Sequence, residues 1–315
     1  MPRPSWISRL FTKPLPPGPP ITSVGMIPER RAFFDWSELN RDLPPMKEVH
    51  EHVLLGTLNG RDLDAEVYVP EGAGPFGALL YIHGGAFCTL SPGHVRKLAM
   101  QFASSGFVVF NLNQSLAPER PFPRPVEDAI FAARWITQNA GRYGCDAKRL
   151  VLAGDSSGAN LAAAAVAFLT GCKAPVIDEG ELSEVSVDVS GLVLLYGVFD
   201  FQQRMSEPST TVGTTEVMSN LAYLGPHFLQ HHKNPLVSPI LASSLAQFPA
   251  TYLCSGSWDA TLGQSLAMTR ALADLDVPVT LSIVPGMDHE FLLAADKEPL
   301  AQAELQRILV WTSAR

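Results

Sequence analysis

The sequence predicts an α/β fold in which helices cover both faces of a mostly parallel β-sheet. From about residue 78 onward, short runs of consecutive apolar residues alternate with longer segments of helical pattern. Strands that are apolar at every position are typical of parallel sheets buried on both faces. One such run, 150–153, continues through Gly-Asp-Ser-Ser-Gly into a small-residue segment of helical character. These observations favour one large domain with an added cap.

The N-terminal region is expected to add an arm and a sheet edge. Prolines concentrated in residues 14–20 predict an extended arm, and a short helix is expected over 29–39. Two strand-like runs follow at 53–58 and 63–69, joined by Asn59-Gly60. Because Asn-Gly favours a two-residue hairpin turn, these runs predict an antiparallel edge.

The rest of the chain supplies the alternating elements. Strands are expected over 78–82, 107–112, 150–153, 191–196, 250–254 and 279–284, and helices over 93–105, 125–139, 157–169, 261–275 and 298–312. The alternation lapses between 200 and 239, where Ser-Thr-Gly-rich sequence precedes short helical segments at 217–224 and 227–232. An insertion after a strand is where a cap over an active site is built, although a surface excursion without substrate contact is the alternative. We expect an arm that contributes to the cap (1–50), a core in two parts (51–200 and 240–315) and a cap insertion (201–239).

Composition narrows the class of partner. The chain has 315 residues and a net charge of −8, and its basic residues are scattered, which argues against a nucleic-acid partner. No apolar stretch is long enough for a membrane span, and residues 1–20 lack the pattern of a signal peptide. The cysteines show no C-x-x-C spacing, which favours free thiols in a reducing compartment. We therefore expect a cytoplasmic protein whose partner is a small molecule.

Ser156 is the candidate nucleophile. It lies in Gly154-Asp155-Ser156-Ser157-Gly158, between a predicted strand and a predicted helix. This arrangement is a nucleophile elbow, in which the serine backbone is strained and the glycines let strand and helix pass closely. The N–H of Ser157 is then aimed at negative charge that forms above the helix N-terminus. We expect Asp155 to serve the hydrogen bonds of the elbow itself.

A serine hydroxyl needs a base and the base needs an orienting carboxylate. The order expected after an elbow is acid and then histidine, and His289, in a loop after the last strand, fits the second place. Asp259 follows the strand at 250–254 and is the favoured acid, with Asp200 as its competitor. Asp288 is adjacent to His289 and cannot easily reach the ring.

The segment that begins at His83 is the candidate oxyanion loop. Gly84 and Gly85 directly follow a predicted strand, and consecutive glycines free the backbone to turn N–H groups toward an oxyanion. The expected oxyanion donors are thus Gly84, Gly85 and Ser157. No H-E-x-x-H spacing or Gly-rich phosphate loop is present, so neither a metal nor a cofactor is expected.

Five motifs in order resemble the bacterial hormone-sensitive-lipase-like esterases of the α/β-hydrolase fold. They are His83-Gly84-Gly85-Ala86-Phe87, Leu116-Ala117-Pro118-Glu119 with Pro121-Phe122-Pro123, Gly154-Asp155-Ser156-Ser157-Gly158, Pro235-Leu236-Val237-Ser238-Pro239 and Gly286-Met287-Asp288-His289-Glu290-Phe291. The resemblance covers residues 76–315 and implies an α/β-hydrolase core with a small helical cap. It also implies a Ser156–His289–Asp259 triad, and it makes a homodimer through the last strand and helix plausible.

The sequence departs from the family pattern in three places. Asn113-Gln114-Ser115 stands where the family has Asp-Tyr-Arg, Ala159 where it has Gly, and Asp259-Ala260-Thr261 where it has Asp-Pro-Leu. The first departure removes an Arg and a Tyr that help to fix a neighbouring loop in the family, and the third lies directly after the candidate acid.

The function expected is a serine carboxylesterase for short to medium acyl chains. Apolar residues in the loops are expected to contact the substrate, namely Phe87, Leu90, Leu221, Tyr223 and Trp258. A deacetylase or amidase could use the same triad, because sequence does not reveal the leaving group. A non-catalytic small-molecule receptor is the alternative of another class, since plant gibberellin receptors resemble this family but lack the catalytic histidine, which His289 supplies here.

Overall fold

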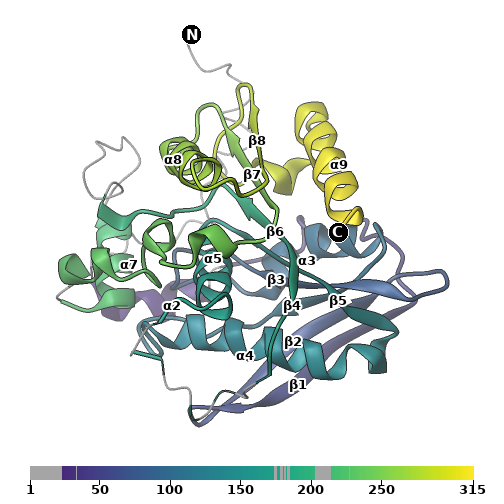
Figure 1. Ribbon diagram of the computed structural model, residues 1–315, viewed down its shortest axis with the longest axis horizontal. Helices are drawn as coiled ribbons and strands as arrows, with labels where there is room; N and C mark the ends of the chain where they lie inside the picture. Colours follow the sequence, from purple (N-terminus) through teal and green to yellow (C-terminus); the bar gives the residue numbers. More distant parts are fainter. Residues whose placement is uncertain are drawn as a thin grey trace.

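The computed structural model describes residues 23–32, 34–173, 176–177, 180, 182, 185–202, 214–226 and 228–315 (Figure 1). The region read for a signal peptide (1–20), which includes the predicted extended segment at 14–20, and part of the predicted insertion lie outside these residues. One eight-stranded sheet runs in the order β1-β2-β4-β3-β5-β6-β7-β8. β2 is antiparallel to β1 and β4, and the remaining neighbours are parallel. The predicted fold class is confirmed.

The strands agree with the apolar runs and extend beyond several of them. Their bounds are β1 (Glu48–Leu58), β2 (Arg61–Val69), β3 (Phe76–Ile82), β4 (Phe107–Leu112), β5 (Cys145–Asp155), β6 (Val189–Leu195), β7 (Thr251–Gly256) and β8 (Val279–Val284). Asn59 and Gly60 join β1 to β2 with φ values of 52° and 70°, the left-handed conformation that a two-residue hairpin turn needs. The antiparallel edge predicted from Asn-Gly is present.

Helices lie on both faces of the sheet. Their bounds are α3 (Pro92–Ala103), α4 (Arg124–Asn139), α5 (Ser157–Leu169), α7 (Thr214–Leu224), α8 (Leu262–Ala273) and α9 (Pro299–Ser313). Apolar residues of α4, α5 and α8 form one buried cluster, and those of α3 and α9 form another. Strand β3 faces both, because Leu80 and Ile82 join the first cluster while Leu79 and Tyr81 join the second.

Helix α5 is the central helix behind the elbow. Its sequence SGANLAAAAVAFL is rich in alanine, a strong helix former with a short side chain, and its first twelve residues are buried. A helix that is apolar all round is buried on all sides, as α5 is here. The helix thereby fixes the position of the elbow at its N-terminus.

The predicted helix over 29–39 is wrong in extent. Helix α2 spans only Ile27–Arg31. Beyond it, Asp35 Oδ1 accepts a hydrogen bond from the backbone N–H of Ser37 at 2.9 Å, and such local side-chain bonds compete with helix. The rings of Phe34 and Trp36 stack with centroids 5.0 Å apart, and Trp36 packs against His94 of α3. Tertiary packing of the aromatic residues replaces the helix.

The carboxyl ends of the parallel strands meet at one edge of the sheet. Ile82, Asp155, Leu195, Gly256 and Val284 are the last residues of β3, β5, β6, β7 and β8. Ligand sites of open α/β sheets lie outside this edge, so the loops that follow these residues are the place to look for chemistry. Among the described residues, no helix combines the length and apolarity that crossing a membrane would require.

Candidate active site

Ser156 lies at the turn between β5 and α5. Its backbone has φ 51° and ψ −119°, the strained conformation expected of the elbow. A Cβ at Gly154 would lie 2.5 Å from the backbone of Gly158, and a Cβ at Gly158 would lie 2.0 Å from the carbonyl oxygen of Ile82. Both glycines are therefore required by close backbone approach, which is the reason predicted for them.

We expect Gly158→Ala to destabilise the fold by about 2 kcal/mol or more, because the new methyl group overlaps the rigid backbone of β3. The free energy of unfolding from urea titration checks this. Gly141→Ala is the matched control, since nothing lies within 4 Å of its Cβ position. An unchanged urea midpoint for Gly158→Ala would contradict the close approach.

The structure brings Ser156, His289 and Asp259 together. Nε2 of His289 lies 2.9 Å from Oγ of Ser156, and Nδ1 lies 2.9 Å from Oδ2 of Asp259. The Asp259 side chain has no exposed surface, whereas the His289 side chain is 34% exposed. A buried carboxylate, an imidazole and a hydroxyl thus form a continuous hydrogen-bonded chain that ends where solvent and ligands reach it.

Asp200 does not take the place of Asp259. Oδ1 of Asp200 accepts a hydrogen bond from the N–H of Gln202 at 2.8 Å, and the N–H of Asp200 donates to Oε1 of Gln264 at 2.7 Å. Asp288 accepts from the backbone N–H of His289 at 2.9 Å, while the ring of that histidine is hydrogen-bonded to Asp259. These hydrogen bonds join Asp200 to Gln202 and to Gln264 of α8, and none of them goes to His289.

Backbone contacts hold the loops after β7 and β8 against each other. The N–H of Trp258 donates to the carbonyl of Met287 at 2.9 Å, and the N–H of Gly286 donates to Oγ of Ser257 at 2.8 Å. A Cβ at Gly256 would lie 2.2 Å from that same carbonyl of Met287, so the approach is as close as glycine permits. This contact places the acid loop beside the histidine loop.

Thr261 is a contact of the candidate acid that the sequence analysis did not identify. Its N–H and its hydroxyl donate to Oδ1 of Asp259 at 2.7 and 2.8 Å, leaving Oδ2 to His289. The departure from Asp-Pro-Leu to Asp-Ala-Thr therefore adds a hydrogen-bond donor to the carboxylate. The only sequence signal was the hydroxyl two residues after the candidate acid, a spacing typical of local turns.

The electrostatic environment of His289 and Asp259 favours the charged form of each side chain. Burial by itself would lower the pKa of His289, but the Asp259 carboxylate, together with Glu290 and Asp155, raises it to about 9. Burial would raise the pKa of Asp259, yet His289 and the donors on Thr261 bring it below its usual value. The carboxylate thus stays ionised and makes the imidazole a stronger base.

This pairing predicts an alkaline-shifted pH profile. A general base must be neutral to accept a proton, so activity should rise as His289 deprotonates, with an apparent pKa above the ordinary 6.5. Because Glu290 is one of the charges that raise this pKa, Glu290→Gln should move the rise toward lower pH. The measurement is kcat/KM for a neutral ester between pH 5 and pH 10, roughly the span in which a shifted histidine titrates. Superimposable profiles for both proteins would contradict it.

The loop after β3 lies against the elbow, and one of its predicted roles needs correction. The N–H of Gly84 donates to Oδ1 of Asp155 at 3.1 Å. A backbone amide has one hydrogen, so Gly84 is not the oxyanion donor predicted from the Gly-Gly pair. Asp155 also accepts from the hydroxyl of Tyr81 at 3.1 Å, so it joins the elbow to β3 and its loop instead of serving the elbow alone.

The N–H groups of Gly85, Ala86 and Ser157 have no hydrogen-bond acceptor in the described part of the chain. Ser157 stands at the first position of α5, where backbone N–H groups lack partners within the helix. Its hydroxyl accepts from the N–H of Phe87 at 3.1 Å, which fastens the loop to the elbow. Ala86 is the second residue the sequence analysis missed, because only the tertiary contacts show which amide of this loop is occupied.

The predicted substrate-contacting residues differ in their accessibility. Tyr223 is fully buried and stacks on Phe87 with ring centroids 3.9 Å apart. Phe87 and Leu90 are also buried, at 6% and 7% exposure, whereas Leu221 and Trp258 are partly exposed. Tyr223 therefore packs against Phe87 and has no exposed surface of its own in this structure.

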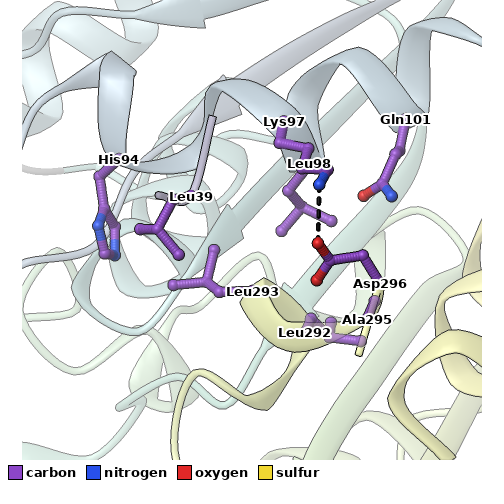
Figure 2. Close-up of a pocket in the computed structure, with 9 residues that line it drawn as sticks. All are labelled: Leu39, His94, Lys97, Leu98, Gln101, Leu292, Leu293, Ala295 and Asp296. Carbon is purple, nitrogen blue, oxygen red and sulfur yellow. Dashed lines mark hydrogen bonds and ion pairs between the residues drawn. The ribbon is translucent and has the colours of Figure 1, made fainter. Parts of the chain in front are cut away.

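A cavity of about 10 Å³ is lined in part by residues 292–296, which follow the loop of His289 in the chain (Figure 2). Its lining includes Leu39 of the N-terminal region, Leu98 of α3 and Leu292, and an ion pair at 2.8 Å joins Lys97 to Asp296 at its rim. The volume admits at most one water molecule, so this is no substrate site. The contacts do anchor the segment that follows His289 to helix α3.

Comparison with known proteins decides the family. A family model described as alpha/beta hydrolase fold matches residues 79–293, a span that contains Ser156, Asp259 and His289. The chain belongs to the α/β-hydrolase family. The hormone-sensitive-lipase-like resemblance carried by its motifs agrees with this family.

Three proteins similar to this α/β-hydrolase carry names of ester-hydrolysing enzymes. An ethyl acetate hydrolase of Pseudomonas putida is 28% identical over 273 residues, which cover 84% of this chain and 82% of that protein. A hyperthermophilic esterase from the archaeon Pyrobaculum calidifontis has a TM-score of 0.82 at 24% identity, covering 100% of this chain and 99% of the other. A bacterial heroin esterase has the same score and identity, covering 99% and 98%. At these identities the structural matches establish the fold.

Proposed function

We propose that this α/β-hydrolase is a serine carboxylesterase with Ser156 as nucleophile, His289 as general base and Asp259 as the orienting acid. The hydrogen-bonded chain from Asp259 through His289 to Ser156, at a strained elbow, supports this proposal most directly. His289 takes the proton of Ser156 as Oγ bonds to the ester carbonyl carbon, and then gives that proton to the departing alkoxide. Water deprotonated by His289 attacks the acyl-enzyme, and the released Oγ recovers the proton.

The oxyanion of each tetrahedral intermediate would accept hydrogen bonds from Gly85, Ala86 and Ser157. The support for this set is that their N–H groups have no acceptor in the described chain, while that of Gly84 is donated to Asp155. Backbone donors fixed in place before reaction cost no reorganisation when the charge develops.

The proposed substrates are esters with short to medium acyl chains. Phe87 and Leu90 are nearly covered, so these two side chains offer little apolar surface to a long acyl chain. The ethyl acetate hydrolase similarity points to the same class. The test is hydrolysis of p-nitrophenyl esters from acetate to palmitate, with the matching butyranilide as amide control. Higher kcat/KM for palmitate than for butyrate, or for the amide than for the ester, would overturn the substrate assignment.

We propose that the arm (1–50) and the insertion (201–239) together form a cap over the candidate active site. In the described parts, helix α7 contacts the arm at Val24–Met26, and Figure 1 places α2 and α7 on the same side of the molecule. The carbonyl of Tyr223 in α7 accepts a hydrogen bond from the N–H of Phe122 at 2.9 Å, which fastens the insertion to the core.

A cytoplasmic location is also proposed. The cysteines are buried free thiols, which suits a reducing compartment.

A homodimer through β8 and α9 is also proposed. Strand β8 is an outer strand of the sheet, and Ile283 of β8 and Val310 of α9 are 41% and 69% exposed. An open strand edge with apolar side chains pairs readily with a second copy. Light scattering should give twice the chain mass for the wild type and a single chain mass for Ile283→Lys with Val310→Lys. A wild type of single chain mass would contradict the dimer.

A further inference from the structure

Arg31, the last residue of α2, joins the N-terminal arm to two loops of the core. Its Nε donates to the carbonyl of Cys88 at 2.7 Å, and Nη2 donates to the carbonyl of Ala117 at 2.7 Å. Its two Nη groups also bind the carboxylate of Glu119 at 2.8 and 2.9 Å. A guanidinium is planar and carries its donors in a fixed fork, so this bidentate pair fixes the direction of the remaining donors.

The loop that Arg31 contacts is conformationally strained. Ala86, Phe87 and Leu90 have φ values of 53°, 64° and 71°, a region that residues with a Cβ rarely occupy. Such conformations persist only where surrounding contacts impose them. Arg31 contacts this strained stretch directly, at the carbonyl of Cys88, which lies between Phe87 and Leu90 in the chain.

Backbone hydrogen bonds connect Cys88, whose carbonyl binds Arg31, to the loop of the proposed oxyanion donors. The N–H of Cys88 donates to the carbonyl of Gly85 at 3.0 Å. The N–H of Ala117, whose own carbonyl binds Arg31, donates to the carbonyl of Phe87 at 2.9 Å. Arg31 therefore reaches the loop by two routes, one directly and one through the neighbouring loop.

We infer that Arg31 is a positioning residue for the oxyanion hole. This inference rests on the proposed function. The Arg31 guanidinium holds the strained loop so that the N–H groups of Gly85 and Ala86 face the oxyanion that forms when the acyl group bonds to Ser156. Docking of the N-terminal arm thus completes the catalytic geometry of the core. The hydrogen bonds of Arg31 go to Cys88, Ala117 and Glu119 and to none of the triad residues.

The test compares wild type with Arg31→Ala, Arg31→Lys and Arg30→Ala in p-nitrophenyl butyrate hydrolysis. We expect Arg31→Ala to lower kcat about ten- to hundredfold with little change in KM, less than the loss of a complete oxyanion donor. Arg31→Lys should keep only part of the wild-type kcat, because an ammonium group lacks the planar fork of donors that a guanidinium carries. Arg30, whose guanidinium lies over the Phe34 ring, is the control from the same helix and should retain wild-type kcat.

Two further readouts separate positioning from a general structural role. Guanidinium chloride at millimolar concentration should raise kcat of Arg31→Ala and leave the wild type unchanged. A boronic acid that mimics the tetrahedral intermediate should lose affinity by the same factor as kcat/KM. A rise in KM without a fall in kcat, or no response of boronate affinity, would overturn the inference.

Hydrogen exchange distinguishes failure of this inference from failure of the proposed function. Backbone amides of 84–90 should exchange faster in Arg31→Ala than in wild type, whether or not esters are hydrolysed. Equal exchange in both proteins would refute positioning even if the wild type is an active esterase. A wild type inactive on all esters, with loop protection still lost in Arg31→Ala, would refute the proposed function and keep the role of Arg31 in the loop.

Discussion

Ser156→Ala is expected to reduce ester hydrolysis by about a millionfold in kcat, to the level left by the oxyanion hole and substrate binding alone. The hydroxyl is the group hydrogen-bonded to Nε2 of His289, and removing it removes the acyl-enzyme route. The backbone conformation at φ 51° is imposed by the elbow and does not depend on the hydroxyl, so the variant should fold normally. Hydrolysis of p-nitrophenyl butyrate, with circular dichroism as a check on folding, measures the effect.

A covalent probe identifies the nucleophile independently of turnover. A serine-reactive organophosphate should add one adduct to the wild type, located by mass spectrometry on the peptide that contains Ser156, and none to Ser156→Ala. Ser105→Ala, a change at a serine whose hydroxyl donates to the carbonyl of Phe102 three residues earlier, should label like the wild type. Labelling or hydrolysis that survives Ser156→Ala would overturn the proposed mechanism.

Asp259→Asn is expected to lower kcat by about 10⁴-fold, the size known when the orienting carboxylate of such a triad becomes an amide. The carboxylate is buried, accepts from Nδ1 of His289 through Oδ2 and is held at Oδ1 by Thr261. An amide in this place turns a donor toward the imidazole or toward Thr261, and the histidine loses the tautomer that leaves Nε2 free to accept a proton.

Asp200→Asn is the matched control, because Asp200 was the competing acid. Its carboxylate accepts from Gln202, and it ends a loop at the same sheet edge. We expect its kcat within about threefold of wild type, as for a change outside the reacting groups. A large loss in Asp200→Asn with retained activity in Asp259→Asn would reverse the assignment of the acid.

The fold was readable from local patterns because each element is encoded by its own residues. The hairpin at Asn59-Gly60 and the limits of α5 follow from turn chemistry and from an apolar, alanine-rich segment. Helix α2 shows the limit of this logic. Its sequence pattern continues past Arg31, but the stacking of Phe34 on Trp36 and the packing of Trp36 on His94 decide the backbone there.

Part of the candidate active site could be predicted from the sequence. The sequence by itself determined the fold class and the identity of the candidate nucleophile and histidine, because an elbow is built from consecutive residues and the chain order restricts the partner. It also predicted the sheet edge at which the loops gather, since parallel strands all end on one side. These properties depend on short-range geometry, which a linear pattern records.

Only the tertiary structure decided which groups in those loops are available. The choice of Asp259 over Asp200 depends on which loop meets the histidine loop, and that contact is made through the Trp258 N–H and the Met287 carbonyl. The Gly84 amide is occupied by Asp155, a residue far away in the chain, so the individual oxyanion donors could not be assigned from the Gly-Gly pair. Arg31 reaches its loop from another part of the chain in the same way. Hydrogen-bond donors and acceptors are satisfied by neighbours in space, and sequence spacing does not show which neighbours those are.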